Sequence, residues 1–148
     1  MKKEHLGQLV WSNGHEYLIE EPFYAHLPFT LKEDVNYKDI IILKKNGFLT
    51  VNPGFAWDGA SGVTWDTPSS RRGVVIHDAL YKLMRKGLLS LEYRIIADKI
   101  LREVCQLDGM FGWRAKGWYK AVRKFGVNAA TKLRKIHRYP KKEEVYRG

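Results

Sequence analysis

The chain contains one cysteine among its 148 residues. An intrachain disulfide is therefore excluded, and a reducing compartment is expected. Cys105 falls within an apolar helical stripe, so we expect its thiol to fill the core rather than to act as a nucleophile. Apolar runs of the roughly 20 residues that span a membrane are also missing, as is an apolar N-terminal stretch of signal-peptide length. We expect neither a transmembrane segment nor a signal peptide.

Acidic residues are missing from a long C-terminal stretch. No Asp or Glu occurs between Gly109 and Lys142, while the formal net charge of the chain is +10. Such a segment needs an anionic partner or a solvated face. The sequence contains no module that reads bases, so phospholipid and nonspecific nucleic acid are both candidate partners. The cations assigned to such a partner are Arg114, Lys116, Lys120, Arg123, Lys124, Lys132, Arg134 and Lys135.

Aromatic residues are interleaved with these cations, at positions 113, 118, 119 and 125. A helix whose aromatic face packs on the core while Lys and Arg point to water would produce the same pattern. That interpretation and an anionic docking surface do not exclude each other.

The first half of the chain has β character. Strands are predicted at Tyr17–Ile19, Asp39–Leu43 and Phe48–Val51, and the stretch between Pro22 and Pro28 is expected to be irregular. Asn46-Gly47 between two β-branched or aromatic runs predicts a hairpin. From Phe55 to Pro68 the chain is rich in Gly, Ser, Thr and Asp, which predicts a loop.

The second half has helical periodicity. A helix is predicted from Ser69 or Ser70, either of which can serve as N-cap, to Gly87 as a C′ glycine. Ser90 should cap a second helix that ends near Leu107. A third covers roughly 113–125 and should break at 126–128, before a basic, weakly helical stretch.

Strands followed by helices predict an α+β fold. We expect an N-terminal hairpin or small antiparallel sheet, then an antiparallel helical hairpin and a basic third helix. A chain of this length is expected to form a single domain over residues 1–148. Its parts are a mainly β segment (1–54), a Gly-rich loop (55–68), a helical core (69–127) and a basic, partly frayed tail (128–148).

Two ionisable residues, His77 and Asp98, occupy apolar helical stripes. The stripes consist of Val74, His77, Leu80, Tyr81 and Met84, and of Leu91, Ile95, Asp98, Leu101 and Cys105. Because the predicted turn at 87–89 lies midway between residues 77 and 98, an antiparallel hairpin places both at one level, roughly 15 Å from the turn. The sequence therefore predicts that the two side chains meet. A carboxylate that fixes one imidazole nitrogen leaves the other free as a base or ligand.

Three motifs together resemble a family of phage and prophage proteins to which no activity is assigned. They are the loop Gly54-Phe55-Ala56-Trp57-Asp58-Gly59-Ala60-Ser61, the helical His77-Asp78-Ala79-Leu80-Tyr81, and the later Ala97-Asp98. The resemblance covers roughly residues 52–125. It implies a phage-type protein located in the bacterial host cytoplasm or in the virion.

The helical half also resembles the catalytic core of phospholipase A2 enzymes, including the parvoviral branch, which lacks disulfides. The resemblance implies that His77 is the general base and Asp78 a calcium carboxylate, with Tyr81 and Asp98 as supporting hydrogen-bonding residues. A Gly-rich loop supplies calcium ligands in that superfamily, and here it would run from Asp58 to Gly62 and include Gly59. Calcium is thus the implied cofactor, although this loop departs from the fuller Gly-x-Gly pattern.

Other interpretations remain open. His77 and Asp98 would also suit a buried pair that joins two helices without chemistry, in a virion or host-interaction protein that binds nucleic acid, membrane or a partner through the basic segment. Asp78 alone would suit a solvated face. An HD-type phosphohydrolase would need a further upstream helical histidine, and His26 lies in a β-like, proline-marked region.

Overall fold

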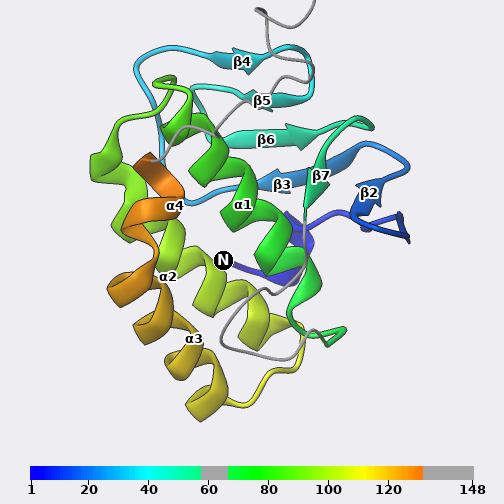
Figure 1. The fold of residues 1–148 in the computed structure, drawn as a ribbon, viewed down its shortest axis with the longest axis vertical. Helices are drawn as coiled ribbons and strands as arrows, with labels where there is room; N and C mark the ends of the chain where they lie inside the picture. The colour runs from blue at the N-terminus through cyan, green and yellow to red at the C-terminus, as the bar shows by residue number, and fades with distance from the viewer. Residues whose placement is uncertain (58–66, 132–148) are drawn as a thin grey trace, which may run out of the picture.

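The computed structural model of the protein describes residues 1–57 and 67–131, and it confirms the predicted α+β fold (Figure 1). Strands occupy the first part of the chain and helices the second. The strands are β1 (Trp11–Asn13), β2 (Tyr17–Ile19), β3 (Phe23–His26), β4 (Val35–Tyr37), β5 (Ile41–Leu43), β6 (Phe48–Val51) and β7 (Ala56–Trp57). The helices are α1 (Arg71–Arg85), α2 (Arg94–Leu107), α3 (Gly112–Phe125) and α4 (Val127–Thr131), with short 3₁₀ turns at Lys3–His5 and Leu91–Tyr93.

The strands form two antiparallel sheets, one with the order β3-β6-β5-β4 and one with the order β1-β2-β7. The predicted hairpin is present as β5 and β6, which pair Ile41 with Val51 and Leu43 with Leu49. Its turn needs glycine at position 47, where φ is +92° and a Cβ would lie 2.4 Å from the carbonyl oxygen of Phe29. A side chain there would be both strained and obstructed.

Two rows of apolar side chains cross the four-stranded sheet. The register aligns Phe23, Val51 and Ile41 in one row and Ala25, Leu49 and Leu43 in the other. All six are at most 1% exposed, and they belong to the same hydrophobic cluster as the buried residues of the helices. The sheet therefore provides the surface on which the helices pack.

Several strands lie where the sequence predicted none. β3 falls in the stretch between Pro22 and Pro28, and β7 falls in the predicted loop. Buried and exposed residues alternate along β3: Phe23 and Ala25 point inward, whereas Tyr24 and His26 point outward. The same alternation of more and less apolar residues is present in the sequence. The strand predicted from Asp39 begins at Ile41, because Lys38 and Asp39 form a tight turn with positive φ.

The first helix has nearly the predicted extent, whereas α2 ends at Leu107 as predicted but begins at Arg94, after a 3₁₀ turn that Ser90 caps. Ser70 is the N-cap position of α1, although its hydroxyl donates to the carbonyl of Thr67 (2.8 Å) instead of capping the helix. Gly87 follows α1 with φ of +72°, and the Ser90 hydroxyl accepts from the backbone N–H of Glu92. The third helix ends at Phe125 as predicted, but the following residues begin the short α4.

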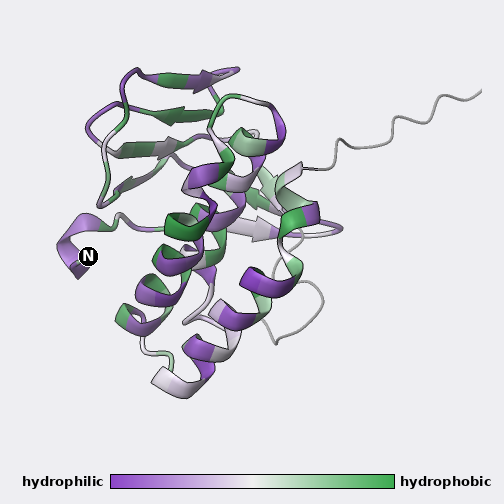
Figure 2. Cartoon of the chain, turned by 90° about the vertical axis from the view of Figure 1, so that its left-hand side faces the viewer, coloured by the Kyte–Doolittle hydropathy of each residue, from purple (hydrophilic) through white to green (hydrophobic). Residues whose placement is uncertain are grey.

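Helix α1 lies between the sheet on one side and α2 and α4 on the other (Figure 1). It is buried on nearly all sides, whereas the other helices have one buried side, and Figure 2 shows hydrophilic and hydrophobic stretches alternating along the helical ribbons. The stripe predicted for the second helix was partly wrong. Leu91 and Ile95 are 51% and 42% exposed, because the buried face consists of Ala97, Asp98, Ile100, Leu101, Val104 and Cys105. Within residues 1–57 and 67–131, none of the helices has the length and apolarity required to cross a bilayer.

The close packing of α1 on α2 depends on Gly73. A Cβ at this position would lie 2.9 Å from Sγ of Cys105 and 3.3 Å from the carbonyl oxygen of Leu101. Cys105 is fully buried, and burial raises the pKa of its thiol to about 12, in agreement with the predicted core role.

We therefore predict that Gly73→Ala lowers the free energy of unfolding by about 1–3 kcal/mol, because the methyl group forces the helices apart. Gly117→Ala is the matched control. Gly117 lies within α3 with nothing near its Cβ position, so alanine should raise stability by about 0.5–1 kcal/mol through helix propensity. Urea denaturation measures both, and equal effects of the two substitutions would contradict the packing argument.

Candidate functional site

The predicted contact between His77 and Asp98 is present where α1 and α2 face each other. Nε2 of His77 lies 2.7 Å from Oδ1 of Asp98. The Asp98 side chain is fully buried, and the His77 side chain is 8% exposed. The equal distance of both residues from the turn thus brought them together as the sequence predicted.

Two further donors complete the environment of Asp98. The Tyr81 hydroxyl donates to Oδ1 at 2.5 Å, and Nη1 of Arg123 in α3 donates to Oδ2 at 2.8 Å. Tyr81 follows His77 by one helical turn, and the centroids of the two rings lie 4.0 Å apart. The carboxylate thus receives hydrogen bonds from α1 and α3 while it is itself part of α2, and so it joins three helices.

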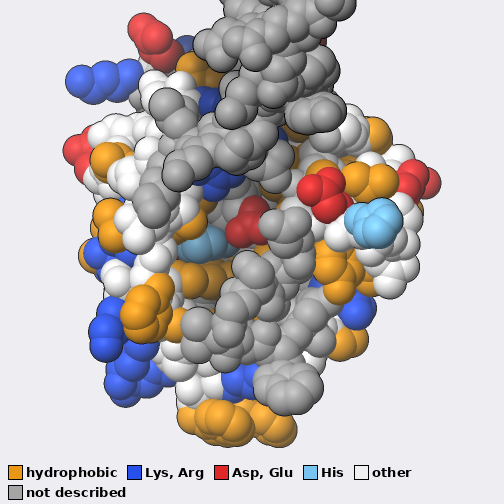
Figure 3. Space-filling model, in the orientation of Figure 1, with side chains coloured by type: hydrophobic (Ala, Val, Ile, Leu, Met, Phe, Trp, Pro, Cys, Tyr) orange, Lys and Arg blue, Asp and Glu red, His pale blue; other side chains and the backbone are white. Residues whose placement is uncertain are grey.

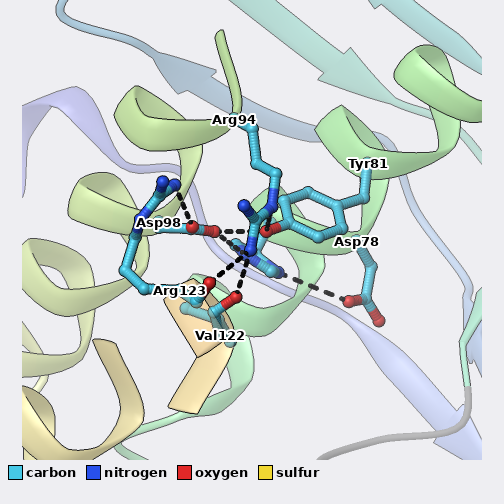
Figure 4. A network of polar contacts seen from close by, with 7 residues as sticks. Asp78, Tyr81, Arg94, Asp98, Val122 and Arg123 are labelled. Carbon is cyan, nitrogen blue, oxygen red and sulfur yellow. Dashed lines mark hydrogen bonds and ion pairs between the residues drawn. The ribbon is translucent and has the colours of Figure 1, made fainter. Parts of the chain in front are cut away.

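Arg94, the first residue of α2, connects the same network to the end of α3. Its Nη2 donates to the carbonyl oxygens of Val122 (2.6 Å) and Arg123 (2.8 Å), and its Nε donates to the Tyr81 hydroxyl (3.1 Å) (Figure 4). The Val122 carbonyl also accepts from the backbone N–H of Gly126, and carbonyls at the C-terminal end of a helix carry partial negative charge. A guanidinium at this position therefore stabilises the end of α3 and orients Tyr81 toward Asp98.

The network keeps Asp98 ionised. Burial alone would raise the pKa of Asp98, but the hydrogen bonds from His77, Tyr81 and Arg123 outweigh burial, and the pKa lies below its ordinary value. Burial and the hydrogen bond to Asp98 raise the pKa of Tyr81 well above its ordinary value. Tyr81 is therefore a fixed hydrogen-bond donor at neutral pH.

An ionised carboxylate only accepts hydrogen bonds, so the contact with Asp98 requires a proton on Nε2 of His77. In the neutral ring, Nδ1 then carries the lone pair. Nδ1 lies 3.9 Å from Oδ1 of Asp78, whose side chain is 39% exposed. Burial lowers the pKa of His77, but the hydrogen bond to Asp98 and the negative charges of Asp78 and Asp98 outweigh it, and the pKa lies above its ordinary value. The ring is thus an oriented base whose reactive nitrogen lies on the side of an exposed carboxylate.

Four of the predicted site residues lie together in the structure. His77, Tyr81 and Asp98 form one hydrogen-bonded group, and Asp78 lies beside the free nitrogen of His77. The loop residues Asp58, Gly59 and Gly62 lie outside the described residues. Within the described part of the chain, no three His, Cys, Asp or Glu side chains come together as a metal site.

The predicted set of anion-binding cations divides into three groups in the structure. Arg123 is bound to Asp98 inside the molecule, and Nη1 of Arg114 donates to Oγ1 of Thr67 while its guanidinium lies over the Trp118 ring. Both arginines therefore have internal roles. The cations of the set that stand exposed on α3 are Lys116, Lys120 and Lys124. Lys132, Arg134 and Lys135 lie outside the described residues.

The sequence analysis missed the internal role of both Arg94 and Arg123. A signal existed for Arg94, because it precedes Asp98 by four residues and so lies on the same face of the second helix. No comparable signal existed for Arg123, because its position depends on how α3 packs.

Comparison of the chain with protein-family models, with curated proteins and with solved structures gives no match in any of the three. The function of the site is therefore argued from its geometry.

Because the pKa of Asp98 is lowered in the folded protein, the contribution of this carboxylate to the free energy of unfolding depends on pH. A carboxyl whose pKa is lower in the folded state stabilises the fold above its unfolded-state pKa, and this contribution is lost as the pH falls through the folded-state pKa. We predict that Asp98→Asn is destabilised relative to wild type at pH 5 and that the difference shrinks as the pH is lowered toward 2.

Each unit of pKa difference corresponds to about 1.4 kcal/mol. Denaturant unfolding of both proteins at several pH values gives the difference directly, and the other carboxylates cancel in it. A difference that stays constant with pH would show that the carboxylate charge is not what stabilises the network.

Proposed function

We propose that this is a phage-type ester hydrolase of phospholipase A2-like mechanism that acts on phospholipids in the host cell or from the virion. The observation that carries the proposal is the orientation of His77: Asp98 binds Nε2 at 2.7 Å, and Nδ1 is left on the side of the exposed Asp78. The proposal is also supported by the contact of Tyr81 with Asp98, because the resemblance assigns the supporting hydrogen-bonding residues to these two positions.

In this mechanism His77 is the general base. Its Nδ1 takes a proton from water as the water oxygen forms a bond to the ester carbonyl carbon, and Asp98 stabilises the imidazolium that results. When the tetrahedral intermediate collapses, the bond from carbon to the alcohol oxygen breaks and the proton passes from Nδ1 to the leaving alcohol. Tyr81 and Arg123 hold Asp98 in place throughout, because both donate to its carboxylate.

The Asp78 carboxylate fits a calcium ligand. It is an oxygen donor, it is 39% exposed, and it adjoins the base in sequence and in space. The remaining ligands would come from the Asp58–Gly62 segment. When bound, calcium would polarise the ester carbonyl and stabilise the oxyanion.

A second candidate function is a non-enzymatic virion or host-interaction protein in which the same network acts only as a scaffold. The observation that favours it is the connection of three helices through Asp98, Arg94 and Arg123. Under this alternative, loss of His77 lowers stability and changes no activity.

The dyad is tested with His77→Asn, which removes the imidazole base and keeps a polar side chain. We predict that hydrolysis of phosphatidylglycerol vesicles falls by about 100- to 10,000-fold, because no base remains to accept the proton from water. Asp98→Asn should lower kcat on the order of 100-fold, because the amide cannot stabilise the imidazolium. Fatty-acid release in the presence of calcium measures both.

His15→Asn is the matched control, since His15 is exposed in the β1–β2 turn. Circular dichroism establishes that each variant is folded. A folded wild-type protein that hydrolyses neither vesicles nor simple esters, with or without calcium, would remove the hydrolase assignment and favour the scaffold.

The role of Asp78 is tested by calcium itself. We predict that calcium raises the melting temperature of the wild-type protein, because a ligand that binds only the folded state stabilises it. Asp78→Asn should lose this shift together with the calcium dependence of hydrolysis, whereas Glu33→Gln, which removes an exposed carboxylate elsewhere, should keep both. A wild-type melting temperature that calcium leaves unchanged, with activity that persists in chelator, would contradict a calcium role.

A further inference from the structure

The solvent side of α3 carries a row of four exposed side chains, one tryptophan and three lysines. They are spaced three or four residues apart, at Trp113, Lys116, Lys120 and Lys124. Ala115 and Trp118, on the opposite side of the helix, are buried. The row spans about 16 Å along the helix at 1.5 Å per residue.

Exposed apolar side chains lie at both ends of this row. Phe111 and Trp113 are 72% and 77% exposed where α3 begins, and Phe125 is 62% exposed where it ends. Figure 3 shows hydrophobic side chains at the lower end of the molecule, where α3 begins, and basic side chains beside them at the lower left. Large aromatic groups left in water this way indicate a surface that is covered in use. We call Phe111, Trp113, Lys116, Lys120, Lys124 and Phe125 the α3 face.

No acidic side chain of α3 or of its neighbouring residues in sequence compensates the positive charge of the α3 face. No acidic residue occurs from Gly109 to the end of the described residues at Thr131. The two arginines of α3 are engaged internally with Thr67 and Asp98, so the lysines supply the outward charge. Such a face complements an anionic surface.

The aromatic ends decide which anionic surface fits. Trp and Phe are favoured at the boundary between lipid headgroups and acyl chains, and lysine stems lie along apolar surface while their ammonium groups reach lipid phosphates. A duplex nucleic acid would use the lysines but would leave Phe111, Trp113 and Phe125 in water. We propose that the α3 face docks the protein on a bilayer rich in anionic phospholipid, with the aromatic side chains at the headgroup boundary and the three lysines at the phosphates.

This proposal does not depend on the hydrolase assignment, because no residue of the α3 face belongs to the His77 network. The two therefore fail separately, and binding can be measured with catalytically inactive His77→Asn protein.

The experiment is cosedimentation of the full-length protein with vesicles of phosphatidylglycerol and phosphatidylcholine, and with vesicles of phosphatidylcholine alone. We expect binding to the anionic vesicles that weakens with added salt. The triple variant Lys116→Gln/Lys120→Gln/Lys124→Gln should bind on the order of 100-fold more weakly. The matched control is Lys32→Gln/Lys45→Gln/Lys99→Gln, which removes the same charge from exposed lysines elsewhere and should bind like wild type.

A second measurement tests the aromatic part. Phe111→Ala/Trp113→Ala should weaken binding to anionic vesicles, and brominated lipid should quench tryptophan fluorescence in wild type more than in Trp113→Phe. Equal binding by the two triple variants would overturn the proposal, as would the absence of vesicle binding. Tight binding to duplex DNA without vesicle binding would assign the face to nucleic acid and overturn it as well.

Discussion

The arrangement of the three main helices depends on the burial of one negative charge. Asp98 is completely removed from solvent, and a buried carboxylate without compensation would be strongly destabilising. Its partners come from two other helices: His77 and Tyr81 from α1, and Arg123 from α3. The charge can therefore remain ionised only if α1, α2 and α3 occupy these positions, and this requirement sets how the helices pack.

The hydrogen bonds that compensate the charge of Asp98 also make the two ring nitrogens of His77 chemically different. Because both oxygens of Asp98 accept hydrogen bonds, the carboxylate cannot turn away from His77. The Nε2 proton is fixed, and the free nitrogen lies on the side of Asp78. A scaffold needs only the first of these properties, whereas a base needs both. The proposed hydrolase would use both properties, and the stabilising role of the network holds under either function.

The sequence predicted what depends on local pattern and helical geometry. The fold class, the β5–β6 hairpin and the meeting of His77 with Asp98 follow from Asn46-Gly47, from apolar periodicity and from equal distances to one turn. It did not predict what tertiary packing decides. β3 was missed because it is short and lies between two prolines, and the outward position of Ile95 was missed because α2 rotates its face toward Ala97 and Ile100. The internal role of Arg123 depends on where α3 crosses α2, which no local pattern encodes.

Helix α3 takes part in both proposed functions, because it contributes Arg123 to the network around Asp98 and also carries the α3 face. Among its residues only Ala115 and Trp118 are buried, so apolar packing holds it less firmly than it holds α1. Polar contacts of Arg94 and Arg123 add to its attachment, and both arginines belong to the network around Asp98. A membrane bound to the outer face of α3 would therefore lie against the helix whose Arg123 holds the carboxylate that orients His77. Because a hydrolase of membrane lipid must act where its substrate is concentrated, a helix that carries the docking face and also holds the carboxylate bound to His77 is consistent with both proposals.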